Sequence, residues 1–398
     1  NCAFIPQCGQ FLPAFGIEII IALIWERTLW FTMGLAVMFS KIPVVYREKQ
    51  LYRQAKKIIA QGEHVTRIGI TGSYGKSSTK EILIHLLQSH FGKENVLYNP
   101  KNQNNSIAVA RLILKNKNFF LSPCSGGTKG GKKFLVMEIS AYGKGFIEEV
   151  CGFIQPQIGI LTGVSAQHMD LFGSQKAIQE AKFELAESVS DKIIFNADNA
   201  LLQEIFADRD IEAVKIPISK SVIHNLKSEP DHSDFECYGE KFTLPWGGEF
   251  FVQNAVLAME VARECGIPPQ KLKKSLEKIK PLERALKVEK HKKGFTVMKD
   301  LYSANPDGVL SAINHLGKMK GRKIFVGIPL RELGEKATES HEQIFSSLKK
   351  IKAEVFWLKA DYSDMGLKIC GKLFHGKDLK KLKEIIKNLE KNDGVLLE

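Results

Sequence analysis

A short segment of glycine, lysine and serine residues has the types of side chain that bind phosphate. It reads Gly72-Ser73-Tyr74-Gly75-Lys76-Ser77, is followed by Ser78, and lies between an apolar run and a helical pattern. In such a turn backbone N–H groups point inward, the next helix N-terminus adds partial positive charge, the lysine reaches the outer phosphates and the following hydroxyl can hold Mg²⁺. The strict pattern G-x-x-x-x-G-K-[ST] requires glycine where Ile70 stands, so the segment is a variant of it. We predict that residues 72–78 bind the phosphates of ATP.

Two further side chains follow buried-type strand patterns and suit a metal site beside these phosphates. Glu138 ends one apolar run, and His168 follows another. The carboxyl ends of parallel strands line the ligand crevice of an α/β sheet, and Mg²⁺ takes one or two carboxylates together with phosphate oxygens and water. On the residues alone the alternatives stay open, because a strand-end glutamate can simply be solvated and a lone histidine is usually structural.

Alternating strand and helix patterns begin near residue 64 and must position these side chains. The segment Val65–Thr71 has a strand pattern, and Ser78–His90 has the spacing of a helix with Ile82, Leu83, Leu86 and Leu87 on one face. Further strands are expected at Lys133–Ile139, Ile158–Thr162, Ile193–Asn196, Phe295–Met298, Lys323–Gly327 and Glu354–Leu358, and helices at residues 252–265, 306–316 and 341–351. We predict an α/β protein in which a parallel-sheet ATP-binding domain, residues 64–285, precedes a smaller Rossmann-like α/β domain, residues 286–398.

Residues 1–63 form a separate apolar and basic segment with a helical pattern. Within residues 11–39, two apolar runs are divided by Glu26 and Arg27, and neither run alone reaches the ~20 residues that cross a bilayer. The alternatives are a re-entrant or interfacial anchor, one imperfect spanning helix, and a helix packed on the soluble part. Two tryptophans and the basic residues that follow favour membrane contact from the cytoplasmic side: Trp25, Trp30, Lys41, Arg47, Lys49, Arg53, Lys56 and Lys57.

The composition excludes several other classes of protein. The net charge is +13, but no basic stretch carries aromatic residues at base-stacking spacing, which argues against nucleic acid as a partner. The lysine-rich stretch near residues 377–387 has the apolar spacing of an amphipathic helix. Seven cysteines without a C-x-x-C pair argue against a zinc ribbon or a disulfide framework and favour a reducing compartment. The chain opens on Asn1 and stops inside an apolar strand pattern at Glu398, so we expect both ends to be truncated.

Several blocks in a fixed order resemble the Mur ligases, the ATP-dependent amide-bond-forming enzymes of peptidoglycan synthesis. The resemblance runs from about residue 64 to 398, and within the family it is strongest to the member that adds D-alanyl-D-alanine. The blocks that carry it are Ile70–Glu81, Asn102–Ile107, Met137–Ala141, Thr162–Ser174, Asn196–Asp198, Asp300–Asp307 and Glu332–Glu335. The resemblance implies a P-loop ligase with ATP and Mg²⁺ as cofactors.

The resemblance also implies a role for each metal-site residue. Ser77 and Glu138 would hold Mg²⁺, and His168 would be a ligand of a second magnesium ion. Lys182 matches the lysine that many Mur ligases carry as a carbamate, which turns a cation into an anionic metal ligand. Lys76, His168 and Lys182 are therefore the expected catalytic residues.

The remaining expected contacts are with the nucleotide. Asn254 matches an asparagine that faces adenine, and Arg284 matches an arginine near the domain hinge that contacts phosphate. Asp300 resembles the acid that contacts the ribose, with Tyr302 and Asn305 in the turn around it.

The reaction implied by the resemblance has two steps. ATP phosphorylates a substrate carboxylate to an acyl phosphate, and an incoming amine then expels phosphate. The implied partners are a muramoyl-peptide nucleotide, or a lipid-linked equivalent, and a D-amino-acid dipeptide, on a cytoplasmic protein attached to the inner face of the cell membrane. The competing hypotheses are another Mur-like ligase of polyglutamate or cyanophycin type, and a membrane-attached ATP-binding regulator that no longer ligates.

The sequence departs from the family pattern at a few positions. Thr162-Gly163 stands where the family has Thr-Asn, and phenylalanine at 250 or 251 replaces a histidine before the adenine-facing asparagine. Ile328-Pro329-Leu330 replaces Gly-Asp-Met. Residues 1–63 do not resemble the N-terminal domain with which the family binds the uridine diphosphate of its sugar–peptide substrate.

Overall fold

A computed structural model describes residues 12–100, 103–122, 131–165, 172–229, 232–280, 287–299, 306–331, 333 and 336–398, with the backbone alone at 12–23, 34, 287, 307, 377 and 379. Contacts divide the chain into two compact units, residues 1–54 and residues 55–398.

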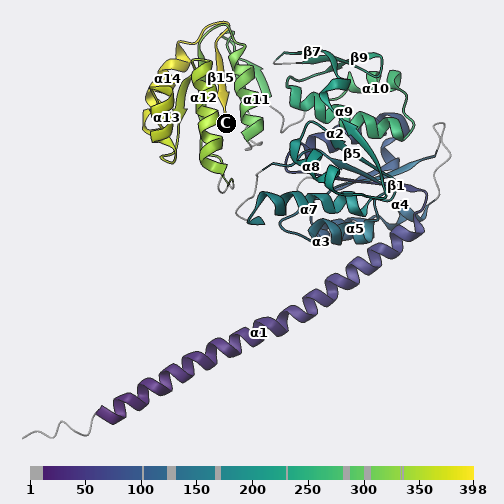
Figure 1. Cartoon of the computed structure of the whole chain (residues 1–398), viewed down its shortest axis with the longest axis vertical. Coiled ribbons are helices and arrows are strands. Elements are labelled where there is room, and N and C mark those ends of the chain that lie inside the picture. Colours follow the sequence, from purple (N-terminus) through teal and green to yellow (C-terminus); the bar gives the residue numbers. More distant parts are fainter. Residues whose placement is uncertain are drawn as a thin grey trace, which may run out of the picture. The chain divides into compact units, whose positions relative to one another are not determined.

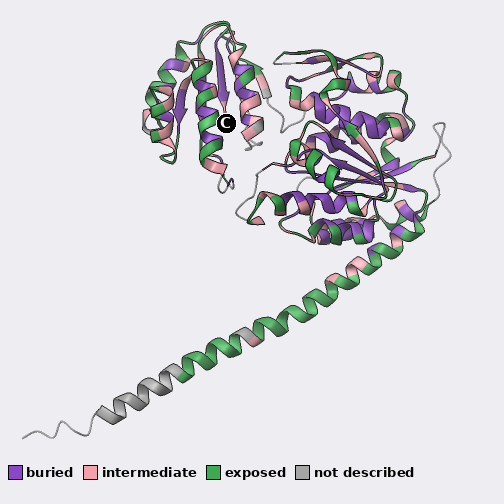
Figure 2. Ribbon diagram, in the orientation of Figure 1, coloured by how far each residue is buried: buried purple, intermediate pink, exposed green. Residues whose placement is uncertain are grey.

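The first unit consists of most of one helix, α1 (Leu12–Gln61), which continues for 50 residues with Pro43 inside it. The two apolar runs of the sequence are thus a single helix. Most of its described large apolar side chains are exposed along the segment from Ile24 to Tyr46, drawn in green in Figure 2. The helix is long and apolar enough to cross a membrane, by length and composition.

A parallel sheet of six strands forms the centre of the second unit. Its order is β2-β3-β1-β4-β5-β6. The strands are β1 (Val65–Thr71), β2 (Val96–Tyr98), β3 (Lys133–Glu138), β4 (Ile158–Leu161), β5 (Lys192–Asn196) and β6 (Val214–Ile218). The chain leaves β1 toward β2 and β3 on one side and continues with β4 on the other. Ligands bind at such a switch in strand order, outside the carboxyl ends of the strands, so the end of β1 is the expected binding position.

Helices cover both faces of this sheet (Figure 1). On one face α2 (Lys76–Phe91) packs against α9 (Glu249–Glu264) and α10 (Pro269–Leu276). On the other, α5 (Phe146–Ile154) packs against α3 (Ser106–Lys115) and α7 (Gln175–Ser188). The smaller helices are α4 (Lys117–Leu121) and α8 (Ala200–Asp208), with the 3₁₀ turns η1 (Lys93–Asn95) and η2 (Lys220–Val222). An antiparallel sheet of β7 (His224–Ser228), β8 (Ser233–Cys237) and β9 (Glu240–Leu244) completes this part.

A second sheet of six strands follows, in the order β10-β11-β15-β12-β13-β14. Its first strand, β10 (Lys287–Lys290), is antiparallel to β11 (Thr296–Lys299), and the other pairs are parallel. The rest are β12 (Lys323–Gly327), β13 (Glu354–Trp357), β14 (Phe374–His375) and β15 (Gly394–Leu397). Around them lie α11 (Pro306–Gly317), α12 (Ala337–Lys350), α13 (Ser363–Cys370), α14 (Leu379–Lys387) and the turn η4 (Gly376–Asp378).

The predicted α/β architecture is confirmed, including the buried face of the helix after the phosphate loop. Ile82, Leu83, Leu86 and Leu87 are all fully buried. The lysine-rich stretch is an amphipathic helix, since Leu382 and Ile385 of α14 are buried while its lysines face solvent. The apolar strand pattern at the end of the sequence is β15, an interior strand between β11 and β12. The proposed boundary near residue 286 stays a prediction, because it falls in the undescribed range 281–286.

Candidate active site

The phosphate loop follows β1 and needs glycine at both of its bends. Gly72 has a φ of 151°, and a Cβ there would lie 2.2 Å from Thr162 Oγ1. Gly75 has a φ of 78°, and a Cβ there would lie 2.6 Å from Asn254 Oδ1. These φ values are ones that L side chains rarely adopt, so backbone conformation and close packing both select glycine. The loop is also tied to the neighbouring strand, because Ser73 N donates to Gly163 O at 2.7 Å.

Lys76 lies at the first position of α2 with its side chain folded over the loop. Its Nζ donates to Gly72 O at 2.6 Å and to Ser73 O at 3.0 Å. Burial lowers the pKa of this ammonium from its ordinary value, and the negative charge of Glu138 opposes the shift. A half-buried cation held at the loop by backbone carbonyls is placed to meet the outer phosphates of a bound nucleotide.

Ser77 and Glu138 converge beside the same loop. Ser77 Oγ donates to Glu138 Oε1 at 3.0 Å, and Lys80 Nζ lies 2.8 Å from Glu138 Oε2. The Asn99 side chain holds the backbone at Glu138, accepting from Glu138 N and donating to Glu138 O, each at 2.9 Å. The carboxylate is buried, with a hydroxyl on one oxygen and an ammonium on the other. A hydroxyl and one carboxylate are a suitable pair of protein ligands for Mg²⁺, which takes its other ligands from phosphate and water.

Lys182 is buried on α7, and its lowered pKa favours the neutral amine. Burial lowers the pKa of Lys182 to about 7, and the positive charge of Lys76 lowers it as well, while Glu184 opposes the shift. Its Nζ lies 5.8 Å from the centre of the Phe172 ring. The helix that carries Lys182 is held by Glu184, whose carboxylate accepts from the N–H groups of Gly145, Ile147 and Glu148 at the start of α5.

Tyr74 explains two departures from the family pattern. A Cβ at position 163 would lie 2.5 Å from Tyr74 Cζ, so Gly163 leaves room for the Tyr74 ring. The ring centre of Phe250 lies 5.5 Å from that of Tyr74. The Tyr74 hydroxyl accepts from Asn199 Nδ2 at 3.1 Å. Glycine at 163 and phenylalanine at 250 are therefore matched to tyrosine at 74.

Asn254 is linked to the phosphate loop by two consecutive hydrogen bonds through Ser78. Its side chain is buried, its Nδ2 donates to Ser78 Oγ at 2.9 Å, and Ser78 Oγ in turn donates to Gly75 O at 2.9 Å. The neighbouring Gln253 donates to Asn196 Oδ1 at 2.6 Å and to Asp198 Oδ2 at 2.7 Å. Gln253 and Phe250 line a cavity beside Tyr74. A contact between Asn254 and adenine stays a prediction.

Several of the expected site residues lie outside the described part of the chain. These are His168, Arg284, Asp300, Tyr302 and Asn305. Among the described residues, no group of three or more His, Cys, Asp or Glu side chains could hold a metal ion.

The structure adds residues for which we had inferred no role. Lys80 and Asn99 position Glu138, Thr162 Oγ1 donates to Tyr74 O, and Asn199 Nδ2 donates to both the Tyr74 hydroxyl and Val164 O. Lys80 and Thr162 fall inside the family-like blocks, and this was their only signal in the sequence. Asn99 and Asn199 carry no pattern that would have identified them.

Comparison with known proteins agrees with this geometry. Residues 70–262 match the Mur ligase middle domain, so the chain contains the middle domain of that family. More particularly, it is 28% identical over 302 residues to the UDP-N-acetylmuramoyl-tripeptide–D-alanyl-D-alanine ligase of Synechocystis sp., an alignment that covers 74% of this chain and 62% of the relative. The chain therefore spans less than two thirds of the length of this curated relative.

Two solved structures have the same fold. MurF from Acinetobacter baumannii superposes with a TM-score of 0.75 at 21% identity, covering 88% of this chain and 76% of that one. The MurF ligase from Thermotoga maritima, solved in complex with ADP, superposes with a TM-score of 0.72 at 23% identity, covering 88% and 79%.

Proposed function

We propose that the chain is an ATP-dependent amide-bond-forming ligase of peptidoglycan precursor synthesis. The observation that carries the proposal is the convergence of Lys76, Ser77 and Glu138 at the end of β1, in a Mur ligase middle domain with Lys182 buried nearby. The substrates we propose are a muramoyl tripeptide on a nucleotide or lipid carrier, and D-alanyl-D-alanine. This choice is supported by the activity for which the Synechocystis relative is named.

The described side chains have separate roles in such a reaction. The loop N–H groups and Lys76 bind the phosphates and neutralise the charge that develops as the terminal phosphoryl group passes to the substrate carboxylate. No protein nucleophile is required, because the amine of the second substrate attacks the acyl phosphate directly and phosphate leaves. Tyr74, Phe250 and Gln253 border the space into which the nucleoside extends from the loop. We propose Asn254, Arg284, Asp300, Tyr302 and Asn305 as further nucleotide contacts.

The donor set fits magnesium, with Ser77 and Glu138 as protein ligands and with His168 and Lys182 proposed beside them. When bound, Mg²⁺ would neutralise phosphate charge and orient the transferred group. Lys182 would act here as a carbamate. Only a neutral amine reacts with CO₂, and a pKa of about 7 leaves a large neutral fraction near neutral pH.

We further propose that α1 attaches the ligase to the inner face of the cell membrane. The exposed apolar stretch from Ile24 to Tyr46 is followed by a basic part of the same helix, which includes Arg47, Lys49 and Arg53. Basic residues that flank an apolar helix stay on the cytoplasmic side.

The test uses the purified full chain with ATP, Mg²⁺, a UDP-muramoyl tripeptide and D-alanyl-D-alanine. We expect phosphate release that depends on both substrates, and a decrease of about 10²–10³-fold in Lys76→Ala, because one charge-stabilising group is lost. Lys182→Ala should also abolish turnover, and added bicarbonate should not restore it. ATP binding without any substrate-dependent turnover would overturn the proposal in favour of an ATP-binding regulator. Near-normal turnover of Lys182→Ala would refute the carbamate role.

A further inference from the structure

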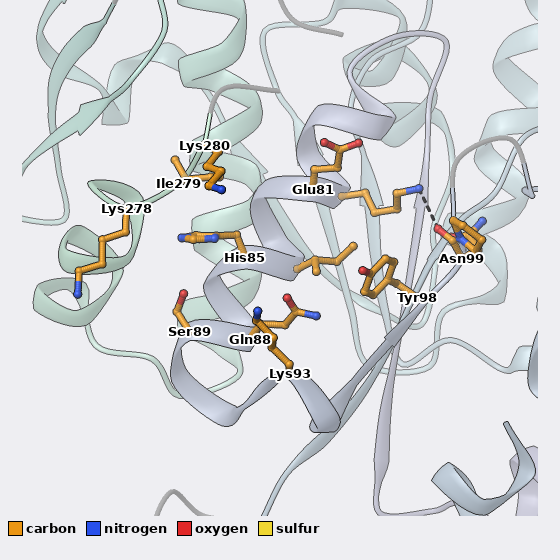
Figure 3. A pocket seen from close by; sticks show the side chains of 13 residues that line it. Glu81, His85, Gln88, Ser89, Lys93, Tyr98, Asn99, Lys278, Ile279 and Lys280 are labelled. Carbon is orange, nitrogen blue, oxygen red and sulfur yellow. Dashed lines mark hydrogen bonds between the residues drawn. The ribbon is translucent and has the colours of Figure 1, made fainter. Parts of the chain in front are cut away.

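A second cavity lies along α2, and Tyr74 is not among the residues that line it. Its volume is about 710 Å³ (Figure 3). One wall is a stripe on α2 that includes Glu81, His85 and Gln88, residues spaced to share one helix face. Tyr98 and Asn99 at the end of β2 and residues 278–280 after α10 form the other walls. Nothing proposed above uses this cavity.

One end of the cavity reaches the proposed metal site. Lys80 lines it, and Lys80 Nζ contacts both Asn99 O at 3.2 Å and Glu138 Oε2 at 2.8 Å. Glu138 in turn accepts from Ser77 of the phosphate loop. A ligand that fills the cavity therefore has one end close to the place where the acyl phosphate would form.

The other part of the cavity is basic and open to solvent. Lys93, Lys278 and Lys280 line it with exposed side chains, and within the described chain none of the three is paired with a carboxylate. Glu81 is the one acidic residue among the described lining residues. Unpaired ammonium groups around a concave surface favour a multiply charged anion, and lysine is a common phosphate ligand.

The spacing of the lining residues along α2 suits the proposed acyl donor. From Lys80 to Phe91 the helix advances about 16 Å at 1.5 Å per residue, and Lys93 follows in the next turn. An extended tripeptide spans about 10 Å, and a sugar follows it before the carrier begins. With the peptide carboxylate at the phosphate loop, the diphosphate on the far side of the sugar would fall near the three lysines. Ile84, Ile279 and Tyr98 offer apolar surface between the two ends.

We propose that this cavity binds the diphosphate end of the acyl donor, with Lys278 and Lys280 as its principal contacts. The inference rests on the proposed ligase function and adds a specificity site to it. The diphosphate is common to a uridine carrier and a polyprenyl carrier, and the experiment distinguishes the two.

The test compares the double variant Lys278→Ala/Lys280→Ala with the wild type. Three acyl donors are used: UDP-linked muramoyl tripeptide, the same peptide on a short polyprenyl diphosphate, and muramoyl tripeptide with a free anomeric hydroxyl. We expect the double variant to raise KM for the diphosphate-linked donors by about tenfold or more, equivalent to about 1.4 kcal/mol. The KM for ATP, the kcat and the KM for the free muramoyl tripeptide should not change. The carrier with the lower wild-type KM is the one this site serves.

Two control variants separate the site from a general charge effect. Lys271→Ala/Lys274→Ala removes the same charge from exposed positions of α10 that do not line the cavity, and should leave every KM unchanged. Lys278→Arg/Lys280→Arg keeps the charge and should retain a KM close to that of the wild type. An unchanged KM in the alanine variant, or an equal rise for the free muramoyl tripeptide, overturns the inference.

Failure of the proposed ligase function would be seen separately, as no phosphate release with any donor. In that case calorimetry decides the site, with a non-hydrolysable ATP analogue filling the phosphate loop and UDP-muramoyl tripeptide as the titrant. Binding that weakens about tenfold in Lys278→Ala/Lys280→Ala, but not in the Lys271/Lys274 control, supports the diphosphate site. Equal binding by all variants overturns it.

Discussion

The phosphate loop and helix α1 differ in the surroundings of their side chains. Polar groups around the loop are buried and paired, whereas most of the described large apolar side chains of α1 are exposed. Around the loop, Thr71 is fully buried and Lys80 is 3% exposed, and both have hydrogen-bond or ion-pair partners. In α1, Trp25 is 72% exposed and Trp30 is 67% exposed. Residues distant in sequence supply the hydrogen-bond and ion-pair partners around the loop. The apolar part of α1 has no comparable packing partners among the described residues.

The difference shows where each region obtains its stability. The loop depends on side chains brought from several strands and helices, so it is sensitive to single changes at its contacts. The helix satisfies its own backbone hydrogen bonds, and in the membrane attachment that we propose a bilayer would surround its apolar side chains. Changes that add charge should therefore act on α1 through membrane binding and leave the fold of residues 55–398 intact.

The largest expected effect is on membrane attachment. Phe31→Asp with Val37→Asp places two charges on exposed apolar positions of α1, each costing about 2.5–3.5 kcal/mol at a membrane centre. We expect the full chain to move from the membrane fraction to the supernatant, measured by sedimentation with lipid vesicles. Gln50→Asp with Gln54→Asp is the matched control, since it adds the same charge beyond the apolar stretch of the same helix. If the wild type and both variants sediment alike, α1 does not bind membranes.

The second effect concerns the pair Gly163 and Tyr74. Gly163→Ala would place a Cβ 2.5 Å from Tyr74 Cζ, and overpacking of this kind destabilises by about 1–3 kcal/mol. We expect a lower Tm for Gly163→Ala by thermal unfolding. Adding Tyr74→Ala should restore much of the loss, because the clashing ring is gone. The double-mutant cycle would contradict the assignment if the two effects were simply additive.

The smallest effect tests the buried amine of Lys182 by its pH dependence. Its pKa falls from 10.5 to about 7 on folding, so between about pH 7 and 10.5 the unfolded state holds more protons and stability rises with pH. Below pH 7 both states are protonated and the penalty of the buried charge is complete. Lys182→Met should therefore stabilise the nucleotide-free protein at pH 6.5, and should stabilise it less at pH 9.5. The measurement is thermal unfolding in bicarbonate-free buffer.

Lys271→Met provides the control, because Lys271 is exposed on α10 and should give the same small change at both pH values. A stability difference for Lys182→Met that does not vary with pH would show that the amine is not buried in this way.

Local patterns were sufficient to predict most of the fold. The spacing of apolar residues along the chain predicts the strand β1 and the buried face of α2, because this spacing involves only residues close together in sequence. Boundaries shifted by a few residues, as at α9, which begins at Glu249 rather than near residue 252. The two apolar runs of α1 were harder, because the Glu26–Arg27 pair interrupts the pattern but not the helix.

The candidate site was predicted less completely, because its geometry depends on contacts across the sheet. The types of Lys76, Ser77 and Glu138 indicated phosphate and metal chemistry. The cavity with Lys93 and Lys278 joins segments nearly two hundred residues apart, and no local pattern connects them.

By itself, the sequence determined the α/β class, the phosphate loop and the apolar helix, because each depends on residue type and short-range spacing. Only the tertiary structure decided that Lys80 and Asn99 position Glu138, that Gly163 makes room for Tyr74, and that burial beside Lys76 shifts the pKa of Lys182. These properties arise from distances and burial between strands and helices far apart in the chain. Residue type determines which chemistry a side chain can perform. Packing determines its charge state and the residues that it contacts.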